Sequence, residues 1–212
     1  MRRVQVIVSR KRALAIILAL AAVIGGIAAW LAFQPTRFAD GTPVWTSTIV
    51  DGAAGSPPPR LGPTAGYDAS SNRMMVFGGA AYNDVWVLSN ANGLGGTSVW
   101  TNTVAQGAAG SPPPRSIHTA VYDAASNRMM VFGGLGSSIY NDVWVLSNAN
   151  GLGGTPGWTN TVAQGAAGSP LGRVQPAAVY DASGKRMILF GGDIFTTYYN
   201  DVWVLSNANA TP

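Results

Sequence analysis

The chain of 212 residues contains no cysteine, no glutamate and one histidine, His118. Without cysteine it can form neither a disulfide nor a thiolate metal site, and it has no cysteine nucleophile. Its carboxylates are nine aspartates, and most of them recur in register at turns of a repeat. Recurrence at equivalent positions favours a structural role over a catalytic one. We therefore predict no catalytic residue, no metal site and no cofactor.

Positive charge is also scarce outside the N-terminus. The net charge is +4, but five cations precede residue 13. From Phe38 onward, seven basic residues stand against nine aspartates, so this part is slightly acidic and has no basic stripe. This distribution gives nucleic-acid binding no support.

An uncharged apolar run occupies residues 13–33. At about 1.5 Å per residue it spans about 31 Å as a helix, close to the thickness of the hydrocarbon core of a membrane. The basic residues 1–12 and the positive-inside rule place the N-terminus in the cytoplasm and the remainder outside it. A cleaved signal peptide, with Gly26 and Ala28 near a processing site, is the alternative. We favour an uncleaved single-pass signal anchor, followed by a linker at 34–44; both interpretations export the rest.

One segment occurs three times almost unchanged. Tyr-Asn-Asp-Val-Trp begins at Tyr82, Tyr140 and Tyr199, and each copy follows a Gly-Gly pair. A period of this length marks a supersecondary unit that buries its apolar faces only against its neighbours. Residues 45–206 are therefore predicted to form repeats, with a tail at 207–212.

Each repeat is predicted to be a four-stranded antiparallel meander. The units cover about 60–105, 115–163 and 173–206, and a further strand is expected at 45–50, giving twelve strands in all. Runs such as Arg128–Phe132 are apolar at four successive positions, which is typical of a strand buried on both faces. A sheet of this kind needs another sheet on each face, as in the blades of a β-propeller. The predicted fold class is all-β, preceded by one transmembrane helix.

These features resemble the kelch repeat family, and the exported character resembles its bacterial members. The resemblance rests on the apolar run into Gly-Gly, the Asp-Val-Trp strand and a later tryptophan. The residues concerned are Gly78, Gly79, Asp84, Trp86, Trp100, Gly133, Gly134, Asp142, Trp144, Trp158, Gly191, Gly192, Asp201 and Trp203. The resemblance implies a kelch-type propeller, and it implies a binding scaffold more often than an enzyme.

Three repeats are fewer than kelch propellers usually have. A ring of three blades would turn more sharply at each blade than propellers of four to eight blades do. The preferred interpretation is a fragment of a longer propeller, followed by assembly with a second copy into six blades. An open arc with exposed blade faces is the third.

Candidate enzymatic chemistry is limited. Galactose oxidase-like kelch enzymes need several histidines and a cysteine-modified tyrosine, which this chain does not supply. His118 follows a Pro-Arg turn, where kelch repeats often carry histidine, and we interpret it as structural. The arginines of the same turns, Arg60, Arg115 and Arg173, are expected to bridge adjacent blades, with Asp84, Asp142 and Asp201 as candidate partners. The alternative is a ring of cations that holds an anionic ligand.

The loops between second and third strands differ most among the copies. Together with the connections leading into each unit, they are expected on one face, where ligands commonly bind. The third loop offers aromatic surface for a sugar or a peptide; neutral drift of a surface loop is the competing explanation. The candidate ligand-binding residues are Phe195, Thr196, Thr197, Tyr198, Tyr199, Asp193, Ser137, Ser138, Ile139, Tyr140, Tyr82, Arg60, Arg115, Arg173 and His118.

The function predicted from these observations is that of a membrane-anchored, extracytoplasmic binding module for a protein or glycan, with possible self-association. The alternative is a fragment or subunit of a kelch-type carbohydrate-active enzyme, oxidase- or epimerase-like, whose site needs further blades. A remnant of duplication that aggregates through exposed blade faces is a third interpretation.

Overall fold

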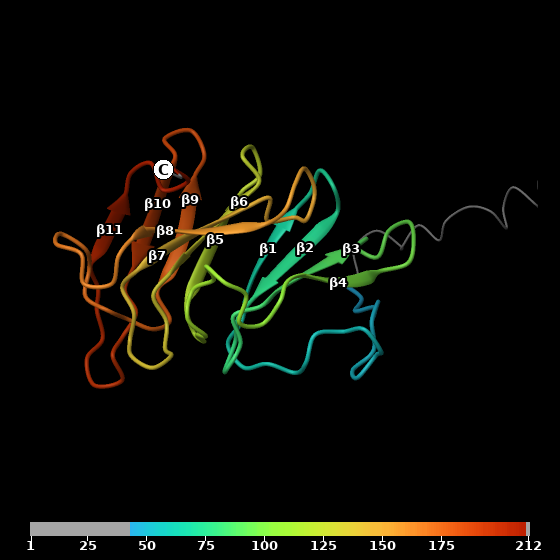
Figure 1. Ribbon diagram of the computed structural model, residues 1–212, viewed down its shortest axis with the longest axis horizontal. Coiled ribbons are helices and arrows are strands. Elements are labelled where there is room, and N and C mark those ends of the chain that lie inside the picture. Colours follow the sequence, from blue (N-terminus) through green and yellow to red (C-terminus); the bar gives the residue numbers. More distant parts are fainter. Residues whose placement is uncertain (1–42, 211–212) are drawn as a thin grey trace, which may run out of the picture. The chain divides into compact units, whose positions relative to one another are not determined.

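The repeats fold into three antiparallel β-sheets, which we call blades. The computed structural model describes residues 43–210, and these contain eleven strands and no helix (Figure 1). The first blade has the order β1-β2-β3-β4, the second β5-β6-β7-β8, and the third β9-β10-β11. The strands are β1 (Thr64–Asp68), β2 (Arg73–Phe77), β3 (Val85–Ser89), β4 (Val99–Val104), β5 (Thr119–Asp123), β6 (Arg128–Phe132), β7 (Val143–Ser147), β8 (Gly157–Val162), β9 (Ala177–Asp181), β10 (Arg186–Phe190) and β11 (Val202–Leu205).

The predicted all-β fold is confirmed, and the blades share one register. Val76 lies opposite Trp86 in the first blade, as Val131 lies opposite Trp144 in the second. The Gly-Gly pair that ends each second strand has positive φ, with values of 70° and 96° at Gly133 and Gly134. A Cβ on Gly134 would lie 2.6 Å from the Cβ of His118, so the backbone approaches this side chain too closely for any larger residue.

The strand predicted at 45–50 is wrong, because these residues form no strand. The prediction of twelve strands is wrong for the same reason. A strand is stable only when its backbone N–H and C=O groups pair with those of a neighbour. In the first blade, β3 already has β2 on one side and β4 on the other, so the position beside the third strand is occupied by β4 and is not open to residues 45–50.

The three blades stack through their first strands and their faces. Strand β5 lies between β1 and β9 (Figure 1). One hydrophobic core joins the first blade to the second, with Met75 and Phe77 against Met129 and Val131. The other core joins the second blade to the third, and it includes Val121, Met130, Phe132, Val143, Val145, Met187, Leu189 and Ala208.

The expectation that second and third strands are covered on both faces fails in the third blade. Phe190, Val202 and Val204 are 54%, 63% and 53% exposed. Their counterparts in the second blade, Phe132, Val143 and Val145, are at most 4% exposed. The physical reason is that no fourth sheet lies against this face among the described residues.

The predicted membrane anchor at 13–33 lies outside the described residues. Within residues 43–210, no helix is long and apolar enough to cross a membrane.

Candidate functional site: the loop face and its arginine frame

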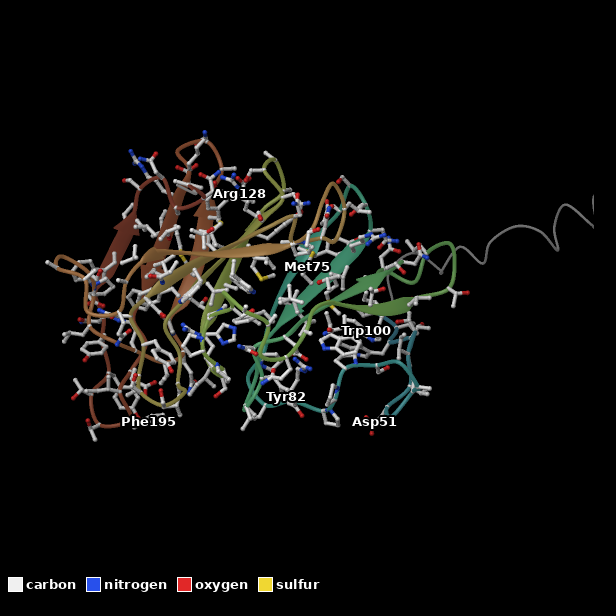
Figure 2. All side chains as sticks on the ribbon, in the orientation of Figure 1. Asp51, Met75, Tyr82, Trp100, Arg128 and Phe195 are labelled. Carbon is white, nitrogen blue, oxygen red and sulfur yellow. The ribbon has the colours of Figure 1, made fainter. Side chains whose placement is uncertain are left out.

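The loops between second and third strands lie beside the connections that lead into each blade, as predicted. Ser116, ahead of β5, forms an isolated bridge with Leu135, and Val174 forms one with Asp193. Tyr82 and Phe195 lie at this end, which we call the loop face, whereas Arg128 lies at the opposite end (Figure 2). The loop face comprises residues 78–84, 105–118, 133–142, 163–176 and 191–201.

A buried arginine holds the loops of the second blade together. The guanidinium of Arg115 donates to both carboxylate oxygens of Asp142, at 2.7 and 2.9 Å, and to the carbonyl of Gly133 at 3.0 Å. It also lies 4.3 Å from the ring centroid of Tyr140. The Nε1–H of Trp144 donates to the same aspartate at 2.7 Å. A paired charge whose three nitrogens all donate hydrogen bonds tolerates burial, which explains why Arg115 is 0% exposed.

The same frame recurs in the other two blades. Arg60 pairs with Asp84 at 2.8 Å and stacks on Tyr82, and Arg173 pairs with Asp201 at 2.6 Å. Tyr199 stacks on Arg173. The predicted Arg–Asp pairs are therefore confirmed, but each joins two loops of one blade rather than two adjacent blades.

The alternative of a ring of free cations does not match this geometry. The side chains of Arg60, Arg115 and Arg173 are at most 6% exposed, and each already has a carboxylate partner. The hydrogen bond from Arg173 lowers the pKa of Asp201 to about 2, so the aspartate stays ionised around neutral pH. These arginines brace the loops instead of offering positive charge to a ligand.

His118 lies in the seam between the first two blades. It is 5% exposed, its Nε2 lies 2.7 Å from the Thr64 hydroxyl, and its ring meets Phe77 edge-on at 5.1 Å. Burial, and then the charge of Arg115, lower its pKa to about 3. The ring is therefore neutral around pH 7 and almost wholly buried, which suits the structural role predicted for it.

The third loop carries the exposed aromatics of the loop face. Phe195 and Tyr198 are 57% and 83% exposed. Phe195 has a φ of 68°, held by a hydrogen bond from its backbone N–H to the carboxylate of Asp193 at 2.8 Å. Thr196 and Thr197 between them are also exposed. Of the predicted aromatic candidates, this loop presents Phe195 and Tyr198, whereas Tyr82, Tyr140 and Tyr199 belong to the arginine frame.

A shallow groove lies between the first and second loops. It has a volume of about 490 Å³. Ser137 and Tyr140 of the candidate set line it, and their hydroxyls lie 3.0 Å apart. Ser138 is exposed beside it, and Ile139 is half-buried. The other lining residues are Ala80, Ala81, Pro113, Pro114, Ser116, Leu135 and Gly136.

Sequence reasoning missed a second set of contacts, at the end of the blades opposite the loop face. The amide of Asn150 donates to Asp68 of the preceding blade at 2.7 Å, and Asn209 donates to Asp123 at the same distance. Burial alone raises the pKa of Asp68, but hydrogen bonds from Ser71, Ser70 and Asn150 outweigh it and lower that pKa. The signal was present, because the asparagine recurs in register at positions 92, 150 and 209.

The described residues contain no group of three or more His, Cys, Asp or Glu side chains arranged to hold a metal ion. Asp193 serves its own turn, and the other loop-face aspartates, Asp84, Asp142 and Asp201, serve the arginine frame. What the loop face offers a ligand is aromatic and hydroxyl surface on a rigid frame.

Fold and site together define a repeat protein built from propeller-type blades with variable loops on one face. The model of the KLHDC2/KLHL20/DRC7 Kelch-repeats domain matches residues 37–211. The chain belongs to the kelch-repeat family.

Curated relatives share the repeats over a small part of their own length. The flagellar outer-arm dynein alpha chain of Chlamydomonas reinhardtii is 32% identical over 162 residues, covering 71% of this chain and 3% of the relative. Human host cell factor 2 is 31% identical over 159 residues, covering 66% and 18%. Kelch repeat-containing protein 2 of Saccharomyces cerevisiae is 29% identical over 199 residues, covering 85% and 20%. The chain thus spans at most a fifth of these three relatives.

Two solved structures are also similar. The structure of YjhT is 19% identical with a TM-score of 0.49, covering 69% of this chain and 36% of that one. A copper-bound fungal alcohol oxidase of the AA5 family is 17% identical with a TM-score of 0.30, covering 62% and 35%. At these values neither similarity supports a statement about activity.

Proposed function

We propose that the chain is a membrane-anchored, extracytoplasmic interaction module that binds a protein or a glycan through its loop face. The observation that carries the proposal is the exposure of Phe195 and Tyr198 on the third loop, beside the buried Arg173 that pairs with Asp201. Exposed large aromatics on a rigid support are the usual anchors of binding surfaces. Membership of the kelch-repeat family supports the protein partner.

The frame explains how the loop is held for binding. Arg173 lies in the connection at 163–176 and donates to Asp201 and to the Gly191 carbonyl, on the two sides of the third loop. The turn within the loop is fixed by Asp193. A loop fixed at both ends loses little conformational entropy when it binds, so its aromatic contacts contribute fully to affinity.

Anchoring and export rest on the sequence of residues 1–33, which has five cations before an apolar run of membrane-spanning length. With this orientation the loop face lies outside the cytoplasm. An alkaline phosphatase fusion after residue 212 tests the orientation in bacterial cells, because the fused enzyme is active only after export. Activity is expected in cells expressing the full chain, and it should disappear when residues 1–33 are deleted.

The binding test places a photo-crosslinking amino acid, p-benzoylphenylalanine, at Phe195 or Tyr198 of the full chain in cells. The matched control carries it at Tyr67, which is 46% exposed. Tyr67 precedes Asp68, at the end of the first blade that lies opposite the loop face. Light-dependent adducts from the loop positions alone are expected for a protein partner. If the partner is a glycan, no protein adduct is expected, and the detergent-solubilised chain should bind to a glycan array. Phe195→Ala should then abolish binding to the array. Equal adducts from Tyr67, or neither adduct nor retention, would contradict the proposal.

A further inference from the structure

The third blade is incomplete at one edge and on one face. In the first two blades the third strand is paired on both sides, β3 by β2 and β4, and β7 by β6 and β8. Among the described residues, β11 pairs with β10 alone. The neighbouring face exposes Phe190, Val202 and Val204 by more than half. Apolar exposure of this kind at positions that are buried in the sister blade marks a surface built for a partner.

The middle blade shows what the missing strand contributes. Trp158 of β8 lies opposite Leu146 of β7, and its ring centroid is 4.8 Å from that of Phe77 in the preceding blade. The tryptophan of a fourth strand therefore fills the seam between its own blade and the one before it. At the next seam Phe132 takes the place of Phe77, and Leu205 takes the place of Leu146.

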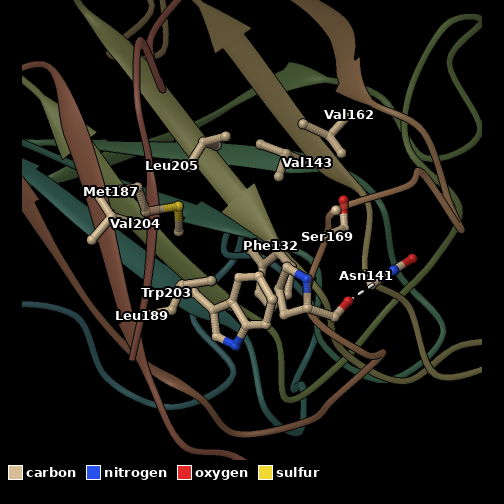
Figure 3. Close-up of a pocket in the computed structure, with 12 residues that line it drawn as sticks. Phe132, Asn141, Val143, Val162, Ser169, Met187, Leu189, Trp203, Val204 and Leu205 are labelled. Carbon is tan, nitrogen blue, oxygen red and sulfur yellow. Dashed lines mark hydrogen bonds between the residues drawn. The ribbon is translucent and has the colours of Figure 1, made fainter. Parts of the chain in front are cut away.

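That next seam contains a cavity in place of a tryptophan. It has a volume of about 80 Å³, and Figure 3 shows Phe132, Leu205 and Trp203 among the side chains around it. Val204, from the open face of β11, also lines it. Most of its lining is apolar, with Asn141 and Ser169 as the polar residues. It lies at the edge where the described residues supply no fourth strand, in the place that the aromatic ring of such a strand would take.

The chain contains one more copy of the fourth-strand sequence. Trp45-Thr46-Ser47-Thr48-Ile49-Val50 matches the segments that begin at Trp100 and Trp158, and residues 52–60 repeat residues 107–115 without a change. Residues 45–50 form no strand, and Trp45 is fully exposed. Strand β4 precedes the second blade in the chain and is the fourth strand of the first blade. By the same pattern, residues 45–50, which precede the first blade, have the sequence of a fourth strand for a blade that would come before it.

The first blade also has, on the face that points away from the second blade, the asparagine that the seams between blades use. Each internal seam joins an aspartate of one blade to an asparagine of the next, Asp68 to Asn150 and Asp123 to Asn209. Asp181 is the third aspartate of this series, and Asn92 is the first asparagine. The Oδ1 of Asn92 accepts the Leu94 N–H at 2.9 Å, as the Oδ1 of Asn150 accepts the Leu152 N–H at 2.8 Å, so Asn92 is already oriented for the seam.

We propose that a second copy of this chain completes the third blade. Residues 45–50 of the second copy pair with β11 as its fourth strand, and the ring of Trp45 fills the cavity against Phe132. The register follows that of β7 and β8, in which Leu146 and Val145 face Trp158 and Thr159; this places Leu205 opposite Trp45 and Val204 opposite Thr46.

The joint is head to tail: it uses β11 of the first copy and residues 45–50 of the second. Residues 45–50 of the first copy and β11 of the second copy therefore remain free to form the same joint again. The second copy offers its own β11 to residues 45–50 of the first. Two copies then complete each other and make six blades, within the four to eight of typical propellers. Because both internal seams join an aspartate to an asparagine and pack a methionine of one blade against the blade before it, a second copy of the chain offers the open face the same kind of surface.

The first experiment is disulfide cross-linking of the full chain, purified in mild detergent. The chain has no native cysteine, so the pair Thr46→Cys with Val204→Cys is unique. Oxidation is expected to give a covalent dimer on a non-reducing gel. The matched control is Thr101→Cys with Val87→Cys, the equivalent pair inside the first blade, which should close within one chain and leave the monomer mass. A disulfide within one chain for the test pair, no disulfide, or a ladder of longer oligomers would overturn the proposal.

The second experiment separates this joint from association through the N-terminal segment. Trp45→Ala and Val204→Asp change exposed residues, so each variant should fold and melt like the parent chain, yet each should weaken dimerisation by about tenfold or more in sedimentation equilibrium. In a mixture of the two variants, each mixed pair has one interface without a substitution, between Trp45 of one copy and Val204 of the other. The mixture should therefore form dimer that neither variant forms alone. Phe195→Asp, on the loop face, is the control and should leave the dimer intact. A parent chain that is monomeric at tens of micromolar, or a dimer indifferent to both changes, contradicts the proposal.

Discussion

The second and third blades have nearly the same sequence but very different surroundings. Phe132 is 1% exposed and lies in the core between blades, whereas its counterpart Phe190 is 54% exposed. The ion pair shows the same contrast, since the carboxylate side chain is 6% exposed in Asp142 and 39% exposed in Asp201. The comparison teaches that a repeat sequence specifies the blade, whereas burial is specified by the neighbouring blade.

The largest expected difference concerns the arginine frame. Replacing Arg115 with Ala leaves the buried carboxylate of Asp142 without its partner, which should cost about 3–5 kcal/mol of unfolding free energy. Arg173→Ala leaves the more exposed Asp201, which water can solvate, so its cost should be clearly smaller. Urea denaturation followed by tryptophan fluorescence measures both. Equal losses would mean that the two blades are equally buried in solution.

Core truncation should show the same contrast. Phe132→Ala removes a buried ring from the seam between the second and third blades and should cost about 3–4 kcal/mol. Phe190→Ala removes a ring that is largely in solvent, so less than about 1 kcal/mol is expected in the monomer. Thermal unfolding of both variants at matched, low protein concentration makes the comparison. A large loss for Phe190→Ala would show that its face is covered in solution.

Acid should weaken the seam between the first two blades through His118. Its pKa is about 3 in the folded protein and about 6.5 in the unfolded chain, so the unfolded state binds the proton more readily. The stability that the neutral ring supports is complete above pH 6.5 and is lost as the pH falls toward 3. The loss between pH 7 and pH 5 should be about 2 kcal/mol. His118→Gln removes the only imidazole and should flatten unfolding free energy over this range; an equally steep fall in the variant contradicts the assignment.

The smallest effect concerns the asparagines that join blades. Asn150→Ala breaks a buried hydrogen bond to Asp68 and should cost about 1–2 kcal/mol. Asn92→Ala, at the same position of the first blade, removes only exposed hydrogen bonds, from Leu94 and Asn72, so the monomer should lose no more than about 0.5 kcal/mol. Chemical denaturation of the monomeric proteins distinguishes them. Equal costs would mean that Asn92 already has a partner carboxylate in solution.

Much of the fold follows from the sequence because the three copies of the repeat can be aligned with one another. Three copies of one pattern place β2, β6 and β10 at their observed bounds, and the Gly-Gly pairs announce positive φ. The pairing of Arg115 with Asp142 was also predictable, since an arginine and an aspartate recur in register in the two loops at the same end of each repeat.

Other features depend on neighbours and could not be predicted from one repeat at a time. Residues 45–50 have the sequence of a strand, yet pairing needs a free edge, and the first blade has none at β3. The stacking of Tyr140 on Arg115 turns a candidate ligand contact into a brace, and only the three-dimensional arrangement reveals it. At the third loop, the exposure of Phe195 and Tyr198 matches the sequence expectation, but their ligand stays a prediction.

The two internal seams use interchangeable residues, and this has a consequence for how such a gene can change. Asn150 and Asn209 make the same contact, and Met129 and Met187 occupy the same place in successive cores. Duplication or deletion of one whole repeat therefore creates no new kind of junction, because each blade already carries both halves of the joint. The number of blades can therefore change by unequal recombination while the contacts between neighbouring blades keep the same residues.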